Sequence, residues 1–330
     1  MGLPLLTLVA LGATVILTLA APPAPAPLDA GGRVWLHAHN CYPDEGRGAD
    51  RLARALAAAD GPVSIEQDVA LDPQRRASVV SHDTALDGTE PTLDEHFFRA
   101  VMPVLDRALA DGPSADWPLM VLHLDFKSNE PEHHAAVWAL LGTYERWLTT
   151  APRVASAALQ PFTLGPLLVL TEQGEGQEGL FHDQVPVGER LRLFGTVPAL
   201  PGANQDTPSA RAAAALAATP EMLIPSGATN YRRWTNFPWA VIELGGQATA
   251  GDWTPADRAR LDALVGRAHR LGLWVRFYTL NGHAPNALGW SDGYNFGSLD
   301  AVQPRWRAAL EAGVNFIATD QYEDFAAIRQ

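Results

Sequence analysis

Cysteine and lysine are almost missing from this sequence. Cys41 is the single cysteine among 330 residues, which excludes an intrachain disulfide. Lys127 is the single lysine among 24 basic residues, so arginine occupies every other basic position. A planar guanidinium does not imitate a compact ammonium group on a flexible stem. We therefore infer that position 127 has a chemical role that arginine cannot fill.

An excess of positive charge is also absent. The formal net charge is −13, which argues against a protein that attracts nucleic acid or an anionic membrane through its overall charge. A local cationic site remains compatible with this charge, and a bound divalent ion would supply one. The chain is 47% hydrophobic, which is enough for a full core, and we expect one large domain that acts as a monomer.

The N-terminal segment is typical of a targeting sequence. Residues 3–21 form an apolar run without charge, and a tract of proline and alanine follows. The run predicts either a signal peptide over residues 1–21, with cleavage near Thr18–Ala20, or an uncleaved membrane anchor. The absence of Lys and Arg before the run departs from the usual signal pattern. Residues 22–32 are expected to form an extended linker, and the folded part, residues 33–330, to lie outside the cytoplasm.

Strand-like and helix-like segments alternate from residue 33 onward, which predicts βα units, a parallel sheet and a TIM-type (β/α)8 barrel. Helices are expected over 48–60, 93–109 (with a kink or break at Pro103), 132–148, 209–218, 254–271 and 304–312. Strands are expected over 34–36, 62–69, 77–83, 118–127, 167–170, 191–197, 239–244, 273–279 and 314–320.

Oxygen-bearing side chains gather at the ends of these expected strands. Asn40 follows the first strand, Asp125 lies near the end of a later one, and Glu66 and Asp68 are two residues apart. Strand alternation puts Glu66 and Asp68 on the same face, where two like charges would repel each other without a cation. Carboxylates and an amide carbonyl are the ligands that Ca²⁺ or Mg²⁺ prefers. The sequence therefore predicts a divalent-cation site made by these four residues.

Two histidines accompany the oxygen ligands. His39 precedes Asn40, and His82 ends the expected strand over 77–83. One neutral imidazole can accept a proton from an attacking oxygen while an imidazolium protonates the leaving oxygen. Lys127 shares a strand face with Asp125 and would offset the charge of a phosphate. Acid, base, metal ligands and a phosphate-binding cation together are the groups that phosphodiester cleavage requires.

Four segments resemble the PLC-like phosphodiesterases, a superfamily of TIM-barrel enzymes that includes phosphoinositide phospholipases C and glycerophosphodiester phosphodiesterases. The matching segments are His39–Tyr42, Glu66–Asp68, His82–Asp83 and Asp125–Lys127, in the family's order. The resemblance implies that His39 and His82 are catalytic and that Asn40, Glu66 and Asp68 bind the metal. Asp125 stands where the family carries glutamate.

The resemblance extends to the last two strand motifs, over 272–279 and 313–320. It implies a phospholipid head group or a glycerophosphodiester as substrate, Ca²⁺ or Mg²⁺ as cofactor, and contact with a membrane surface. Arg276, in the penultimate strand, would hold the phosphate or head group, or form an inward structural ion pair. The pattern His37–Tyr42 together with Arg276 is most similar to a fungal and bacterial subgroup whose substrate is poorly defined.

Two other classes of function remain open. His37 and His39, one residue apart, also resemble the first-strand pair of amidohydrolases and PHP-type metal hydrolases. Those families need an aspartate on the last strand, which Asp320 would supply, and histidines on later strands, where His182, His269 and His283 are not convincing. The third class is a catalytically silent binding barrel, against which the complete set of catalytic groups argues.

Several further residues are interpreted from their surroundings. His37 and His123 are expected to be hydrogen-bonded histidines of the core, and His133 and His134 to lie on the solvent side of a helix. Glu243 is placed at a strand end, where it could line the pocket. Residues 231–234 are expected to form an exposed recognition loop.

Overall fold

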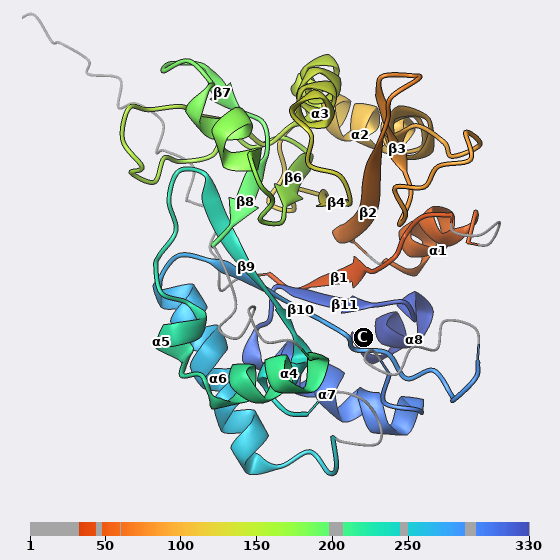
Figure 1. The fold of residues 1–330 in the computed structure, drawn as a ribbon, viewed down its shortest axis with the longest axis vertical. Helices are drawn as coiled ribbons and strands as arrows, with labels where there is room; N and C mark the ends of the chain where they lie inside the picture. Colours follow the sequence, from red (N-terminus) through yellow and green to blue (C-terminus); the bar gives the residue numbers. More distant parts are fainter. Residues whose placement is uncertain are drawn as a thin grey trace, which may run out of the picture.

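The computed structural model describes residues 33–43, 48–59, 61–197, 207–244, 250–287 and 295–329. Within these residues eight parallel strands close into a barrel, because β1 pairs with both β2 and β11 (Figure 1). The predicted TIM-type (β/α)8 fold is confirmed. The barrel strands follow one another in chain order as β1 (Trp35–Ala38), β2 (Val63–Asp72), β4 (Met120–Phe126), β6 (Leu167–Thr171), β8 (Phe194–Thr196), β9 (Arg232–Pro238), β10 (Trp274–Tyr278) and β11 (Phe316–Thr319).

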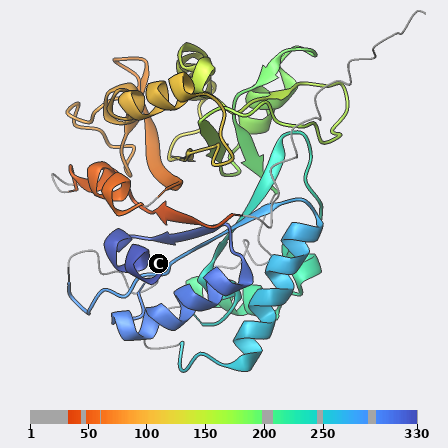
Figure 2. The same cartoon turned by 180° about the vertical axis from the view of Figure 1, so that it is seen from behind.

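Helices cover the outside of the barrel. Figures 1 and 2 show α1 to α3 on one side of the strands and α4 to α8 on the other. The α-helices are α1 (Arg51–Ala58), α2 (Arg99–Asp111), α3 (Pro131–Thr143), α4 (Pro208–Ala217), α5 (Pro220–Leu223), α6 (Pro255–Arg270), α7 (Leu299–Ala312) and α8 (Tyr322–Arg329). Short helical turns are η1 (Asp94–Phe98), η2 (Glu145–Trp147), η3 (Gly179–Asp183) and η4 (Trp239–Val241).

Three more strands lie outside the barrel. β3 (Ala77–Val80) runs antiparallel to β2, so the two form a hairpin that extends beyond the barrel wall. β5 (Ala151–Pro152) and β7 (Arg190–Leu191) form a separate two-stranded ribbon. Because β3 runs back along β2, the residues after it return to the level of Asp68, and the amide of Ser81 donates to the Asp68 carbonyl.

Local sequence signals explain several helix ends. Thr254 and Asp257 form a reciprocal capping box at the start of α6, and Pro255 occupies its first turn, as the sequence predicts. Gly313 ends α7 with φ 77°, a left-handed conformation that glycine adopts without a steric penalty. Pro103 does not break its helix, since η1 and α2 run continuously from Asp94 to Asp111.

The prediction for residues 231–244 is wrong. Residues 239–244 are not a strand: η4 and a turn occupy them, and the strand is β9, which begins at Arg232. Residues 231–234 are therefore barrel wall and not an exposed loop. The two consecutive arginines obscure the strand, yet the guanidinium of Arg233 is buried against Phe162, 4.4 Å from the ring centroid, so its charge does not require solvent.

The predicted exposure of His133 and His134 is also wrong. Both side chains are buried, with 0% and 1% exposure. His133 lies 2.9 Å from the Ser78 hydroxyl and 2.8 Å from the Ser128 hydroxyl, so it joins α3 to β3 and to the end of β4. The histidines face the barrel because α3 packs on its strands with this side, and the serines satisfy the polar ring.

The barrel interior divides into two parts. Its lower part is apolar and includes Trp35, Val121, Leu168, Phe194, Trp234, Trp274 and Phe316. Above this plug, toward the carboxyl ends of the strands, the inward positions carry histidine, carboxylate, amide and guanidinium groups. A second apolar cluster fills the space between the strands and the surrounding helices. Apolar side chains thus fill one end of the barrel interior, and polar side chains gather at the other end.

The predicted targeting segment and linker, residues 1–32, lie outside the described residues. Among the helices that the structure describes, none has the length and apolar character needed to span a bilayer. The location outside the cytoplasm stays a prediction from the sequence.

Candidate active site

The polar groups at the carboxyl ends of the strands form two layers. The rim layer consists of His39, Asn40, Asp68, Asp125, Lys127 and Asp320. The layer beneath it, called the buried layer below, consists of His37, Glu66, His123, Glu172, Asn236 and Arg276, of which Glu172 and Asn236 are half-buried and the others buried. Strand register produces this arrangement, because Glu66 stands opposite His123 and Asp68 opposite Asp125. The side-chain period of two keeps residues 66, 68, 123 and 125 on the inner face.

Lys127 joins two carboxylates of the rim. Its Nζ lies 2.9 Å from Asp68 Oδ2 and 2.7 Å from Asp125 Oδ2. Burial would lower the pKa of Lys127, but the two carboxylates raise it above its ordinary value. The ammonium therefore stays charged, and one of its three protons remains for another acceptor.

Tyr42 links this group to Asn40. Its hydroxyl lies 2.7 Å from Asp68 Oδ2 and 3.0 Å from Asn40 Oδ1. Asn40 has a left-handed backbone with φ 51°, a conformation that asparagine tolerates better than most residues. The turn that it makes brings its side-chain amide back to Asp320 Oδ1, at 3.1 Å.

His39 is held by a carboxylate from the last strand. Its Nδ1 lies 2.9 Å from Asp320 Oδ1, and Asn281 donates to the other oxygen of Asp320 at 2.8 Å. Burial would lower the pKa of His39, but Glu66 and Asp320 outweigh this effect and raise it. A carboxylate on Nδ1 fixes the ring and directs its chemistry to Nε2. The site thus contains an imidazole suited to proton transfer.

Glu66 is the centre of the buried layer. Its carboxylate lies 2.9 Å from Arg276 Nη2, and nitrogen atoms of His37, His123 and His39 lie 3.6, 3.5 and 3.8 Å away. Burial would raise the pKa of Glu66, but the charge of Arg276 and the surrounding imidazoles hold it well below its ordinary value. Glu66 is therefore ionised at 3% exposure.

Two residues of the buried layer escaped the sequence reasoning. The Nη1 atom of Arg276 lies 3.0 Å from Asn236 Oδ1 and 3.5 Å from Glu172 Oε1. Glu172 directly follows the apolar strand β6. A carboxylate at the end of an apolar strand is the pattern that predicted the other acidic residues of the site, so the sequence also indicates Glu172. Asn236 lies in β9, and the misassignment of that strand hid it.

The charges of the site fit a cation. The two layers contain five carboxylates and two permanent cations, Lys127 and Arg276, and one of the carboxylates, Asp320, is paired with His39. Oxygen atoms of Glu66, Asp125 and Glu172 lie within 4.8 Å of one another. Oxygen donors at this density suit a hard divalent ion, so these residues could hold a metal. Of the four predicted ligands, Glu66 and Asp125 belong to this group, whereas Asn40 and Asp68 lie beside it and are joined through Tyr42.

The carboxyl group of Asp68 is expected to make the free energy of unfolding depend on pH. Burial, and then the charges of Glu66 and Asp125, raise its pKa to about 7, whereas an unfolded aspartate titrates near ~3.9. Between these values the folded chain keeps a proton that the unfolded chain releases, so this contribution to stability is lost as pH rises toward 7. Urea unfolding with a chelator should show wild type losing stability relative to Asp68→Asn from pH 4 to 7. Parallel pH curves would contradict the raised pKa.

His82 lies near the rim but outside the two layers. The hairpin of β2 and β3 brings its backbone beside Asp68 through the Ser81 hydrogen bond. Its side chain is 58% exposed, and its Nδ1 is 3.8 Å from the Asp83 carboxylate. The structure therefore places the backbone of His82 at the margin of the site and its side chain largely in solvent.

Glu243 does not line the site, and its expected position at a strand end is wrong. It follows η4, and both of its oxygens accept from the Arg305 guanidinium, at 2.6 and 2.9 Å. The indole of Trp239 donates to it as well, at 2.8 Å. Glu243 thus ties the turn after β9 to α7 and has a structural function.

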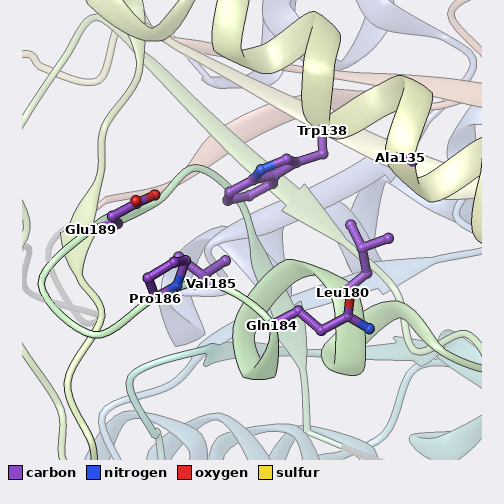
Figure 3. A pocket seen from close by; sticks show the side chains of 7 residues that line it. All are labelled: Ala135, Trp138, Leu180, Gln184, Val185, Pro186 and Glu189. Carbon is purple, nitrogen blue, oxygen red and sulfur yellow. The ribbon is translucent and has the colours of Figure 1, made fainter.

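Two cavities border the barrel. A surface pocket of about 260 Å³ lies between α3 and the segment around η3 and is lined by Ala135, Trp138, Leu180, Gln184, Val185, Pro186 and Glu189 (Figure 3). None of these residues belongs to the polar layers. A second cavity, of about 110 Å³, has Glu172 in its wall and is otherwise lined by β8, β9 and the 173–179 loop. Of these two cavities, the second shares Glu172 with the candidate active site.

Comparisons with known proteins give one structural likeness. No family model matches the sequence, and no curated protein matches it. The structure is similar to the phosphatidylinositol-specific phospholipase C from Listeria monocytogenes, with a TM-score of 0.46 and 11% sequence identity. The likeness covers 94% of this chain and 97% of the other. The strand order establishes the barrel independently of this likeness.

Proposed function

We propose that this protein is a phosphoric diester hydrolase that cleaves a phospholipid head group or a glycerophosphodiester. The observation that carries the proposal is the His39–Asp320 pair at the rim, set beside carboxylates, an ammonium and a guanidinium. An oriented imidazole supplies the proton transfer that phosphodiester cleavage needs, and the cations supply charge for the phosphate.

His39 and His82 divide the proton transfers in this proposal. Nε2 of His39 accepts the proton of the attacking hydroxyl as its oxygen bonds to phosphorus, and Asp320 stabilises the imidazolium that forms. The bond from phosphorus to the leaving oxygen breaks, and His82 protonates that oxygen. Where the substrate carries a hydroxyl beside the phosphate, that hydroxyl attacks and a cyclic phosphate forms; otherwise water attacks and the product is open.

The other rim residues bind and position the substrate. Lys127 uses its remaining proton on a phosphate oxygen, while Asp68 and Asp125 fix the ammonium. Glu66, Asp125 and Glu172, with Asp68 and Asn40 beside them, would hold one Ca²⁺ or Mg²⁺, which would polarise the phosphoryl oxygen and lower the pKa of the attacking group. Arg276 supports this layer from below through its ion pair with Glu66.

The cavity beside Glu172 is the proposed position for the alcohol part of the substrate. Its wall includes the polar side chains of Gln173, Thr196 and Arg232. Such groups suit hydroxyls better than acyl chains, so a phospholipid would present its head group here and leave its chains at a membrane surface.

A substrate panel tests the proposed function. The full chain would be incubated with phosphatidylinositol, sphingomyelin and glycerophosphodiesters, each with Ca²⁺, Mg²⁺ or chelator, and the products read by ³¹P NMR. We expect cleavage of at least one diester, with a cyclic product where a neighbouring hydroxyl is present. Activity that Zn²⁺ supports and neither Ca²⁺ nor Mg²⁺ supports would favour the amidohydrolase or PHP-type alternative. An inert panel would favour the silent binding barrel.

A further inference from the structure

We propose that the buried layer contains a site for a transition-metal ion such as Zn²⁺ or Co²⁺, formed by His37, Glu66 and His123. The three residues come from β1, β2 and β4, which are neighbours in the barrel wall. One ligand atom from each lies within 4.8 Å of the other two. The site shares Glu66 with the group of carboxylates described above, takes its other two ligands from imidazoles, and does not depend on the proposed function.

The separations match those around a small metal ion. His37 Nε2 lies 3.6 Å from Glu66 Oε2, and His123 Nδ1 lies 3.5 Å from Glu66 Oε1. In a tetrahedral site with bonds of about 2.1 Å, neighbouring ligand atoms stand about 3.4 Å apart. Both distances are too long for hydrogen bonds, which require about 3.2 Å or less. The two distances run to different oxygens of Glu66, so an ion between the two rings would meet both oxygens of this carboxylate.

The two imidazole nitrogens need a partner. His37 and His123 are 1% and 0% exposed. Among the described residues, neither His37 Nε2 nor His123 Nδ1 has a hydrogen-bond partner. A buried polar atom without a partner destabilises the folded state. One ion between these atoms would satisfy both nitrogens at once.

Neighbouring groups orient each imidazole as a ligand. The other nitrogen of His37, Nδ1, lies 2.7 Å from the Ser64 hydroxyl. The other nitrogen of His123, Nε2, has no hydrogen-bond partner among the described residues and faces the Glu172 carboxylate at 3.4 Å. Metal-bound histidines typically give their second N–H to a hydroxyl, carbonyl or carboxylate, which fixes the tautomer. In the proposed site the His37 ring would donate its Nδ1–H to Ser64 and turn its unprotonated Nε2 to the ion.

The donor set selects the class of metal. Two imidazoles and one carboxylate suit Zn²⁺ or Co²⁺, whereas Ca²⁺ and Mg²⁺ prefer oxygen ligands throughout. Arg276 and Glu172 flank the site and carry opposite charges. Together they therefore add no net charge around the proposed ion. The apolar rings of Trp234 and Phe316 pack against His123 and His37, respectively, and shield the ion from water below.

Cobalt spectroscopy tests the proposal. The chelator-treated full chain would be titrated with Co²⁺ alone and followed by visible absorption. We expect one equivalent to give the strong bands of tetrahedral Co²⁺, unchanged by excess Mg²⁺ or Ca²⁺. His123→Gln and His37→Gln should abolish these bands, and Ser64→Ala should weaken Co²⁺ binding roughly 10–100-fold. Asp125→Asn, the matched control, changes only the carboxylate group and should keep them.

X-ray absorption on the Co²⁺-loaded wild type keeps the test decisive if the histidine variants do not fold. Two imidazole nitrogens in the coordination shell are expected. An oxygen-only shell, weak octahedral bands, or displacement of Co²⁺ by Mg²⁺ would overturn the proposal, because the ion would then occupy the carboxylate group. Phosphodiesterase activity with Mg²⁺ or Ca²⁺ would stand or fall separately.

Discussion

Alanine in place of either His39 or His82 is expected to lower kcat for phosphodiester cleavage by about 10²–10⁴-fold, the usual contribution of a general acid or base. His39 is backed by Asp320 and lies within the rim layer. His82 lies at the margin with its side chain largely exposed, and in the proposed mechanism it protonates the leaving oxygen of a bound substrate. Steady-state kinetics on the substrate found by the NMR panel measures both effects.

The pH profile separates proton transfer from a merely structural effect. Because Glu66 and Asp320 raise the pKa of His39, Asp320→Asn removes one of the two charges and should lower that pKa. If neutral His39 is the base, the acid limb of kcat/KM moves to lower pH in this variant. His96→Gln is the control: His96 contacts the Cys41 carbonyl at 3.5 Å, belongs to neither layer, and should keep the wild-type profile.

The turnover of each alanine variant decides whether that histidine takes part in catalysis. Unchanged turnover in His82→Ala would remove His82 from the mechanism and leave protonation of the leaving group to another acid. Unchanged turnover in His39→Ala would overturn the proposed mechanism, in which the His39–Asp320 pair accepts the proton of the attacking group. Metal affinity, measured by calorimetry, should be nearly unaffected in His82→Ala.

The barrel could be predicted because parallel strands have a simple signature. Each buried strand is a short apolar run, a helical segment follows most of them, and polar residues mark the carboxyl ends. β9 lacks this signature, because it begins with Arg232 and Arg233 and ends at Pro238. The mostly apolar residues 239–244 resemble a strand instead, although a helical turn occupies part of them. Arg233 tolerates burial only because aromatic rings and carbonyl groups from distant segments receive it, and no local pattern shows that.

The sequence predicts which face of each strand the site residues occupy, but it does not predict how deep in the barrel they lie. Alternation along a strand shows that Glu66 and Asp68 point inward together, as do His123 and Asp125. It does not show that Glu66 and His123 lie one layer below Asp68 and Asp125, where a guanidinium from the opposite wall reaches them. The pairing of His39 with Asp320 joins residues 281 positions apart, and it follows only from closure of the barrel by β1 and β11.

His82 shows a different limit. A histidine at the end of an apolar run resembles the other strand-end residues, but β3 is antiparallel to the barrel strands. Its carboxyl end therefore points back along β2 and not to the shared rim. Only the hairpin geometry, which sets Ser81 beside Asp68, returns His82 to the neighbourhood of the site.

Loss of the Arg276 side chain is expected to cause the largest change in stability. Arg276 and Glu66 are 1% and 3% exposed, and their charged groups are 2.9 Å apart. Removing one partner of a buried ion pair leaves an unpaired charge and costs roughly 3–5 kcal/mol. Urea unfolding of Arg276→Met should show this loss. Arg54→Ala, which breaks an exposed pair with Glu323, is the matched control and should cost about 1 kcal/mol or less.

The double variant Arg276→Met with Glu66→Gln decides why stability is lost. If the unpaired carboxylate is the cause, neutralising Glu66 restores part of the loss, and the double variant is more stable than Arg276→Met alone. If the two losses simply add, Arg276 acts through packing, including its contact with the Tyr278 ring 5.1 Å away, and the ion pair is not the main contribution. An unaltered free energy of unfolding in Arg276→Met would show that the guanidinium is free to bind substrate, as the sequence left open.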